Sequence, residues 1–294
     1  MSLLQKAKRP TDIVLAPIIS LIGPPGVGKT SLAGLFPNAI FVQAETASTV
    51  FEDWDQDKQP MMLPQIPSRA NPVEYMQVLI KELIDTEHDY QTLVIDTGDK
   101  LNGLFEAFIA KRDNVGSVAD ASGGFHKGYD EVAGWHAEIF TALDILRKRK
   151  NMAIVILFHT GVKKRKNNPD EPSEYTVMST NMHDKSTAVY TNNSDAVMYL
   201  INEKYVLGEQ KNRKGQVTAY GRVTNSGERV LITCSDGQTG YVEAKNRYGL
   251  DPKIPVPIGT NPLLTMLKFF AKDKANRDQP EFDSRESETT EIKL

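Results

Sequence analysis

The chain has 294 residues, enough for one large domain or two small ones, and its 40% hydrophobic and 25% charged residues are typical of a soluble globular protein. Its formal net charge of −3 excludes nucleic-acid binding driven by overall charge and leaves that role to local basic patches. The single cysteine, Cys234, excludes a disulfide framework within the chain, and the longest apolar run, residues 152–158, is too short to span a bilayer. We therefore expect a cytoplasmic protein with no membrane partner.

In chain order, a loose basic arm is expected over residues 1–10 and an apolar strand over residues 16–22. The next segment has the spacing G-x-x-x-x-G-K-[ST] of a phosphate-binding loop and leads into a short helix that Pro37 ends. Its residues are Gly23, Pro24, Pro25, Gly26, Val27, Gly28, Lys29, Thr30 and Ser31. Such a loop directs backbone N–H groups and a helix dipole at phosphate oxygens. We expect Lys29 to reach the β- and γ-phosphates of ATP and the Thr30 hydroxyl to ligate Mg²⁺.

Two later apolar strands end in acidic residues. Residues 39–42 lead to Glu45, and residues 92–95 lead to Asp96. Downstream of a phosphate loop, Asp96 is expected to hold the Mg²⁺ hydration shell beside Thr30. The residue after Asp96 is Thr97 rather than an acid, so Glu45 becomes the candidate base that activates water. The alternative for Glu45 is a strand-end carboxylate exposed to solvent.

The middle of the chain alternates helical patterns with irregular segments. Apolar residues at helical spacing predict helices over residues 73–87 and 130–150, and residues 101–113 form a further candidate. A glycine-rich segment, residues 115–129, is expected to be flexible. The apolar strand 152–158 ends at His159, which could contact the γ-phosphate or could be an ordinary core or surface histidine. Residues 161–187 lack periodicity and are predicted to form a long loop.

The pattern changes in the last third of the chain. A strand is expected over residues 195–201, and alternating segments separated by turn residues predict an antiparallel meander from residue 204 to residue 234. A short helix is expected over residues 262–272. These elements predict an α/β fold with a mainly parallel sheet, helices on both faces and an antiparallel extension at one edge. The expected parts are the arm 1–10, the core 11–258, a C-terminal helix 259–275 and a disordered acidic tail 276–294.

This order of parts resembles the RecA-like P-loop ATPases, and most of all the bacteriophage ATP-binding proteins of that class that act as recombinases or single-strand annealing proteins. The resemblance covers residues 15–252 and rests on the phosphate loop, on the strand ending in Glu45, on the strand ending in Asp96, and on the strand ending at His159. RecA itself usually has Gln at the last of these positions, so His159 departs from the pattern.

The resemblance implies further roles. It likens Lys245 and Arg247 to a basic pair that reaches the nucleotide of a neighbouring subunit, where a solvated turn is the alternative. It also places residues 115–129 and 161–187 where such proteins contact DNA. Stacking and phosphate contacts are then expected from Phe125, His126 and Lys127, and phosphate contacts from Lys163, Lys164, Arg165 and Lys166, which could otherwise be a solubilising run.

The function that the resemblance implies is ATP-dependent recombination on single-stranded DNA. Its partners would be single-stranded DNA, further copies of the chain in a filament or ring, and a single-strand-binding protein, in the cytoplasm of a phage-infected bacterium. A hexameric replication motor or helicase-loader-type ATPase is the main alternative. A non-catalytic, ATP-gated binding module also stays open, whereas a small-molecule kinase is less favoured because we find no arginine-rich lid.

Overall fold

The computed structural model describes residues 14–46, 48–166, 174–207, 210–211, 217–219, 222–235 and 242–271. The predicted arm 1–10 and tail 276–294 lie outside these ranges. None of the helices in the described part is both long and apolar enough to cross a membrane.

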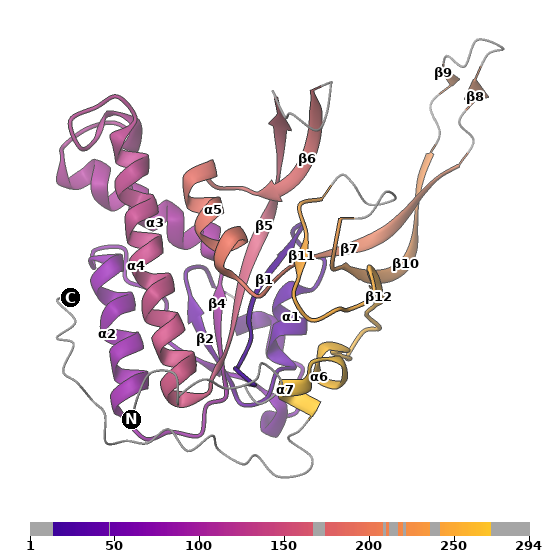
Figure 1. Ribbon diagram of the computed structural model, residues 1–294, viewed down its shortest axis with the longest axis horizontal. Coiled ribbons are helices and arrows are strands. Elements are labelled where there is room, and N and C mark those ends of the chain that lie inside the picture. The colour runs from indigo at the N-terminus through magenta and orange to yellow at the C-terminus, as the bar shows by residue number, and fades with distance from the viewer. Residues whose placement is uncertain are drawn as a thin grey trace, which may run out of the picture.

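A mainly parallel sheet forms the centre of the molecule (Figure 1). Its parallel strands lie in the order β7-β1-β5-β4-β2, with the two-residue β3 parallel to β2 at the outer edge. The antiparallel strands β10 and β12 extend the other edge, and β11 also pairs with β7. The bounds are β1 Ile18–Gly23, β2 Ala39–Gln43, β3 Met61–Met62, β4 Thr92–Asp96, β5 Ala153–Arg165, β7 Ala196–Leu207, β10 Arg222–Ile232, β11 Lys245–Asn246 and β12 Lys253–Pro255. The predicted parallel sheet with an antiparallel extension is therefore confirmed.

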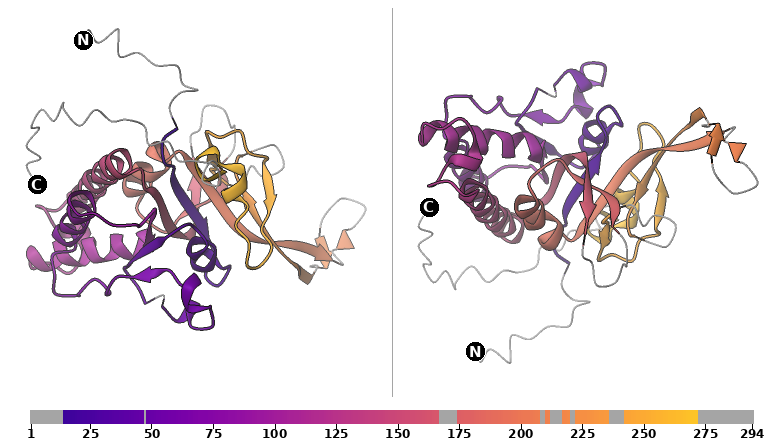
Figure 2. Two further views of the ribbon diagram at one scale, coloured as in Figure 1. Left: turned by 90° about the horizontal axis from the view of Figure 1, so that it is seen from below. Right: turned by 90° about the horizontal axis from the view of Figure 1, so that it is seen from above.

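Helices cover both faces of the sheet, as Figure 2 shows from two sides. The helices on one face are α2 (Pro72–Asp85), α3 (Gly98–Arg112) and α4 (Lys127–Lys150), with α5 (Asp184–Asn193) beside α4. The other face carries α1 (Lys29–Gly34), α6 (Leu263–Met266) and α7 (Lys268–Ala271). Short 3-10 helices are η3 (Ser48–Phe51), η4 (Gln56–Lys58) and η5 (Val118–Asp120).

The alternation of side chains along the strands divides the core into two layers. Ile18 and Ile22 of β1 pack with the layer formed by α2 to α5, whereas Ile19 and Leu21 pack with α1 and the C-terminal helices. Because both faces of the central strands are buried, their sequences are continuous apolar runs rather than alternating ones. This burial is the reason that the sequence shows these strands clearly.

Three expectations about elements were wrong. The described residues between 161 and 187 are not a loop: β5 continues to Arg165, β6 (Tyr175–Thr180) returns antiparallel to it, and α5 follows. β7 is one strand of 12 residues that joins the expected strand 195–201 to the first strand of the meander, and the small pair β8 (Gln210–Lys211) and β9 (Val217–Ala219) lies beyond it. The single helix expected over residues 262–272 is two short helices, α6 and α7. The outer part of β5 was not predicted as a strand. Half-buried and exposed side chains alternate along it, but both kinds include charged residues, so a hydrophobicity pattern does not show the alternation.

Candidate functional site

The segment between β1 and α1 has the backbone shape of a phosphate-binding loop. Gly28, the N-cap of α1, has φ 91°, a left-handed conformation that glycine adopts without steric cost. Gly23 ends β1 so close to β7 that a Cβ there would lie 2.5 Å from the carbonyl oxygen of Leu200. Both positions therefore require glycine, and the loop can bend so that its N–H groups face inward.

Lys29 is the cation of this loop. Its side chain is 6% exposed, and Nζ donates hydrogen bonds to the carbonyl oxygens of Gly23 at 2.9 Å and Pro24 at 3.1 Å. Burial lowers the pKa of Lys29, and the nearby carboxylates of Asp96, Asp99 and Glu45 oppose this shift. The ammonium group is thus held within the curve of the loop, near acidic groups that follow other strands.

Asp96 at the end of β4 contacts the loop directly. Thr30 Oγ1 donates a hydrogen bond of 2.8 Å to Asp96 Oδ2, although β5 lies between β1 and β4 in the sheet. Burial raises the pKa of Asp96 to about 6, and the carboxylate of Glu45 adds to the shift. A hydroxyl beside a carboxylate is a donor set that suits Mg²⁺, which usually keeps several waters and takes few protein ligands. The described residues contain no cluster of three or more His, Cys, Asp or Glu that could hold a metal by themselves.

Glu45 lies beside this pair, where a base that activates water is expected. Its backbone N–H donates to the carbonyl oxygen of Asp96 at 3.4 Å. Thr97 Oγ1 donates to Glu45 Oε1 at 3.3 Å, and Lys100 Nζ lies 3.5 Å from Oε2. The Glu45 side chain is 33% exposed, so it contacts both the cluster and solvent. The carboxylate is oriented from two sides, whereas a solvated strand end would be free to rotate.

His159 of β5 completes the cluster. Its Nε2 lies 3.9 Å from Glu45 Oε1, and its Nδ1 lies 2.8 Å from Asp99 Oδ2. Asp99, Lys100 and Thr97 are members of this site that were not predicted from the sequence. The signal was present in Asp-Thr-Gly-Asp, residues 96–99, because a helix that starts directly after a strand end returns its first turn to that end.

Comparison with known families identifies the class of this site. A family model described as an AAA domain matches residues 16–248. The chain belongs to this AAA-domain family of P-loop ATPases. Membership supports ATP binding and hydrolysis in general, usually with Mg²⁺, and it leaves the finer recombinase type open. A comparison with curated proteins found no match.

Two further predicted residues of this AAA domain lie away from the phosphate loop. Lys245 and Asn246 of β11 pair with the start of β7, next to the start of β1, whereas the loop follows the end of β1. Lys245 Nζ donates to the carbonyl oxygen of Asn192 at 2.7 Å, and Arg247 Nη1 lies 3.3 Å from Asp195 Oδ1. The structure therefore does not bring Lys245 and Arg247 to the ATP site of their own chain. A role at a neighbouring subunit stays a prediction.

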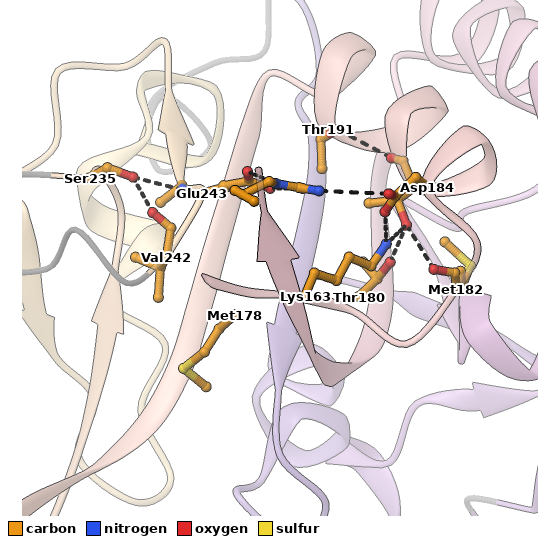
Figure 3. A network of polar contacts seen from close by, with 12 residues as sticks. Lys163, Met178, Thr180, Met182, Asp184, Thr191, Ser235, Val242 and Glu243 are labelled. Carbon is orange, nitrogen blue, oxygen red and sulfur yellow. Dashed lines mark hydrogen bonds and ion pairs between the residues drawn. The ribbon is translucent and has the colours of Figure 1, made fainter. Parts of the chain in front are cut away.

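The basic run of residues 163–166 in the AAA domain divides between two faces of β5. Lys163 Nζ donates to Asp184 Oδ1 at 2.6 Å, and Arg165 makes two bonds of 2.6 Å to the Glu243 carboxylate. Figure 3 shows Lys163, Asp184 and Glu243 within this network. The alternate residues Lys164 and Lys166 are exposed. Three of the four cations thus have a carboxylate partner, since Lys166 Nζ lies 3.0 Å from Glu174 Oε1, whereas Lys164 is exposed on the outward face of the strand. Contact of this run with phosphate stays a prediction.

The other predicted DNA-contacting residues precede and begin α4. Phe125 is 92% exposed and has φ 55°, and His126 has φ 61°. Both residues are in the left-handed region, which is uncommon outside glycine. The His126 ring stacks on Tyr129 with a centroid distance of 6.0 Å, and Lys127 opens the helix with an exposed side chain. These three side chains are accessible to a ligand.

Proposed function

We propose that this AAA domain is an ATP-dependent, DNA-binding recombination protein of the RecA-like or single-strand annealing type. It would bind single-stranded DNA and hydrolyse ATP where copies of the chain meet. One observation carries the proposal: β5 runs without a break from His159, in the acidic cluster beside the phosphate loop, to the exposed Lys164. The same strand thus joins an ATP site to the hairpin of β5 and β6, which carries the basic residues 163–165.

The ATP site has a clear division of roles. The loop N–H groups and Lys29 bind the phosphates, while Thr30 and Asp96 hold Mg²⁺. The metal, when bound, neutralises charge on the phosphate oxygens. Glu45 accepts the proton of the attacking water, and Lys100 and Thr97 hold its carboxylate in place.

The proposed DNA contacts use accessible side chains before α4 and at the outer end of β5. Lys164 and Lys166 neutralise backbone phosphates, and Phe125 and His126 stack on bases, with Lys127 beside them. Contacts of this kind do not depend on base sequence, as an annealing or strand-exchange protein requires. Because His159 lies 3.9 Å from Glu45, DNA that displaces the hairpin of β5 and β6 would also move a residue beside the catalytic base.

The test is ATP hydrolysis by the full chain, measured with and without single-stranded DNA, together with electron microscopy of the assemblies. We expect single-stranded DNA of unrelated sequences to stimulate hydrolysis and to support filaments or rings. A rate of ATP hydrolysis that is the same with and without DNA, together with no DNA binding at low salt, would contradict the proposal. Closed rings that move along duplex DNA would favour the replication motor instead.

A further inference from the structure

A cavity of about 760 Å³ borders the phosphate loop on a side that Glu45, Asp96 and Asp99 do not line, and Asp57 contributes an acidic side chain to its lining. Gly26, Gly28 and Ser31 line it from the loop and α1, Trp54 from the segment after β2, and Arg229 from β10. Its volume is typical of small-molecule sites, which measure about 300–1,000 Å³. Neither Lys29 nor Glu45 lines the cavity. The loop therefore separates the catalytic groups from this space.

Arg229 reaches from the antiparallel extension to the loop itself. A Cβ built on Gly28 would lie 2.4 Å from Arg229 Nη1, so the missing side chain of Gly28 makes room for the guanidinium. Nη2 donates to the carbonyl oxygen of Pro257 at 3.2 Å, and Nε is buried with no hydrogen-bond partner among the described residues. Burial lowers the pKa of Arg229. A cation with an unused donor at the edge of a phosphate loop is suited to an anion.

The polarity of a nucleotide decides which end enters this cavity. The terminal phosphate must lie at Thr30, Asp96 and Glu45, because hydrolysis requires the metal ligands and the base at that end. The nucleoside must then leave the loop on another side. The cavity begins at Gly26 and Gly28 and continues along α1, and it offers both polar groups and the half-buried ring of Trp54.

We propose that this cavity receives the base and ribose of ATP, and that Arg229 binds the phosphate nearest the ribose. The inference rests on the proposed ATP site and extends it to a residue outside every motif of the sequence. It also gives the antiparallel extension a function within its own subunit, since β10 carries Arg229 to the loop. Arg229 is here a binding residue for the nucleotide and not a proton-transfer group.

Trp54 provides a direct reporter of the cavity. The chain has two tryptophans, and Trp135 packs against Phe105 at a centroid distance of 5.8 Å, between α3 and α4. The variant Trp135→Phe leaves Trp54 as the only indole. We expect ATP with Mg²⁺ to change its fluorescence, and inorganic tripolyphosphate to compete for the loop without producing the same change, because it has no base to contact Trp54.

Arg229→Ala in the same background tests the cation. We expect the Kd for ATP, measured by calorimetry, to rise at least tenfold, and Arg229→Lys to keep part of the affinity because it keeps the charge. Arg149→Ala, at an exposed arginine of α4, is the matched control and should bind ATP normally. Thermal unfolding of each variant, measured without nucleotide, checks that the fold is kept.

These experiments distinguish failure of the cavity as the nucleoside site from failure of the ATP site itself. ATP binding that leaves Trp54 fluorescence unchanged and has the same Kd in Arg229→Ala would overturn the inference, while the phosphate loop and its catalytic groups would stand. Failure of the wild-type chain to bind ATP at all would overturn the proposed function and the inference together.

Discussion

His159 and Asp99 are joined by two hydrogen bonds. The backbone N–H of His159 donates to Asp99 Oδ1 at 2.9 Å, and its ring Nδ1 lies 2.8 Å from Oδ2. Burial alone would raise the pKa of Asp99, but these bonds outweigh it and lower the pKa. The ionised carboxylate can only accept, so Nδ1 carries the proton and Nε2 faces Glu45. One carboxylate at the start of α3 thus holds both the backbone of β5 at His159 and the orientation of the ring.

Asp99→Asn should therefore reduce turnover without weakening ATP binding. An amide in place of the carboxylate removes the charge that orients the ring, whereas the hydrogen bonds of Asp99 go to His159 and not to the phosphate loop. We expect kcat to fall about tenfold, the lower end for loss of an orienting partner, with little change in KM for ATP. Steady-state kinetics with and without DNA measure this, and an unchanged kcat would show that the ring orientation is irrelevant to hydrolysis.

Glu45→Gln should keep ATP binding and lose turnover by about 10² or more, the usual scale for a general base. The amide preserves the size of the side chain and can still contact Thr97 and Lys100, so the structure of the cluster should persist. Calorimetric ATP binding and a hydrolysis assay test the two halves of this prediction. Normal hydrolysis would place the base elsewhere. Glu87→Gln, at a fully exposed carboxylate, is the control.

The raised pKa of Asp96 should make the free energy of unfolding depend on pH. Its pKa is about 6 in the folded chain and 3.8 as the ordinary value, so the folded state holds a proton more tightly. Without metal or nucleotide, the free energy of unfolding should fall as pH rises from about 4 to about 6, by up to about 3 kcal/mol. Asp96→Asn should flatten this change. Urea unfolding at several pH values measures it, and equal slopes in both proteins would contradict the raised pKa.

The same carboxylate makes the metal site sensitive to pH. A proton on Asp96 competes with Mg²⁺, so metal-dependent ATP binding should weaken below about pH 6.

Lys164→Ala with Lys166→Ala should weaken DNA binding equally on unrelated sequences. It should also reduce the slope of log K against log salt by about 1.4, since each phosphate contact on a single strand contributes about 0.7. Arg149→Ala with Lys111→Ala removes two exposed cations elsewhere and should change neither quantity. Titrations of DNA binding at several salt concentrations measure both quantities. An unchanged slope would show that Lys164 and Lys166 do not contact DNA phosphates.

Lys163 and Arg165 are unsuitable targets because their ion pairs hold the hairpin of β5 and β6 to α5 and Glu243.

Arg247 tests whether hydrolysis needs a second subunit. Its ion pair with Asp195 leaves the side chain 57% exposed, so Arg247→Ala should cost little stability. If it acts on a neighbouring ATP, Arg247→Ala should bind ATP but lose hydrolysis and ATP-dependent assembly. Mixed with Lys29→Ala, which lacks the loop cation, it should regain part of the activity. If verified mixed assemblies recover no activity, Arg247 acts within its own subunit or has no role in hydrolysis.

The sequence alone determined the features that depend on local rules. The loop from Gly23 to Thr30 follows from residue types at fixed spacing, and β1, β4 and β5 are apolar runs because their faces are buried. Glu45 and Asp96 could be predicted as residues at or just after strand ends, since parallel strands end at one edge of a sheet. His159 was expected to end its strand as well, but it lies where the parallel pairing of β5 with β1 ends, and β5 continues to Arg165. The tertiary structure decided what each of them touches. Asp99 became a partner of His159 only because α3 starts beside β5.

The tertiary structure also decided which cations are free. Residues 163–166 are four adjacent charges in the sequence, yet α5 and Glu243 neutralise Lys163 and Arg165, Lys166 lies 3.0 Å from Glu174 at the surface, and Lys164 faces solvent. Lys245 and Arg247 could not be assigned to either end of the sheet before the register of β11 on β7 was known. Arg229 lies 201 positions after Gly28, and no local pattern records their contact. Pairings between distant segments depend on strand order and register, which are properties of the whole fold and not of any short stretch.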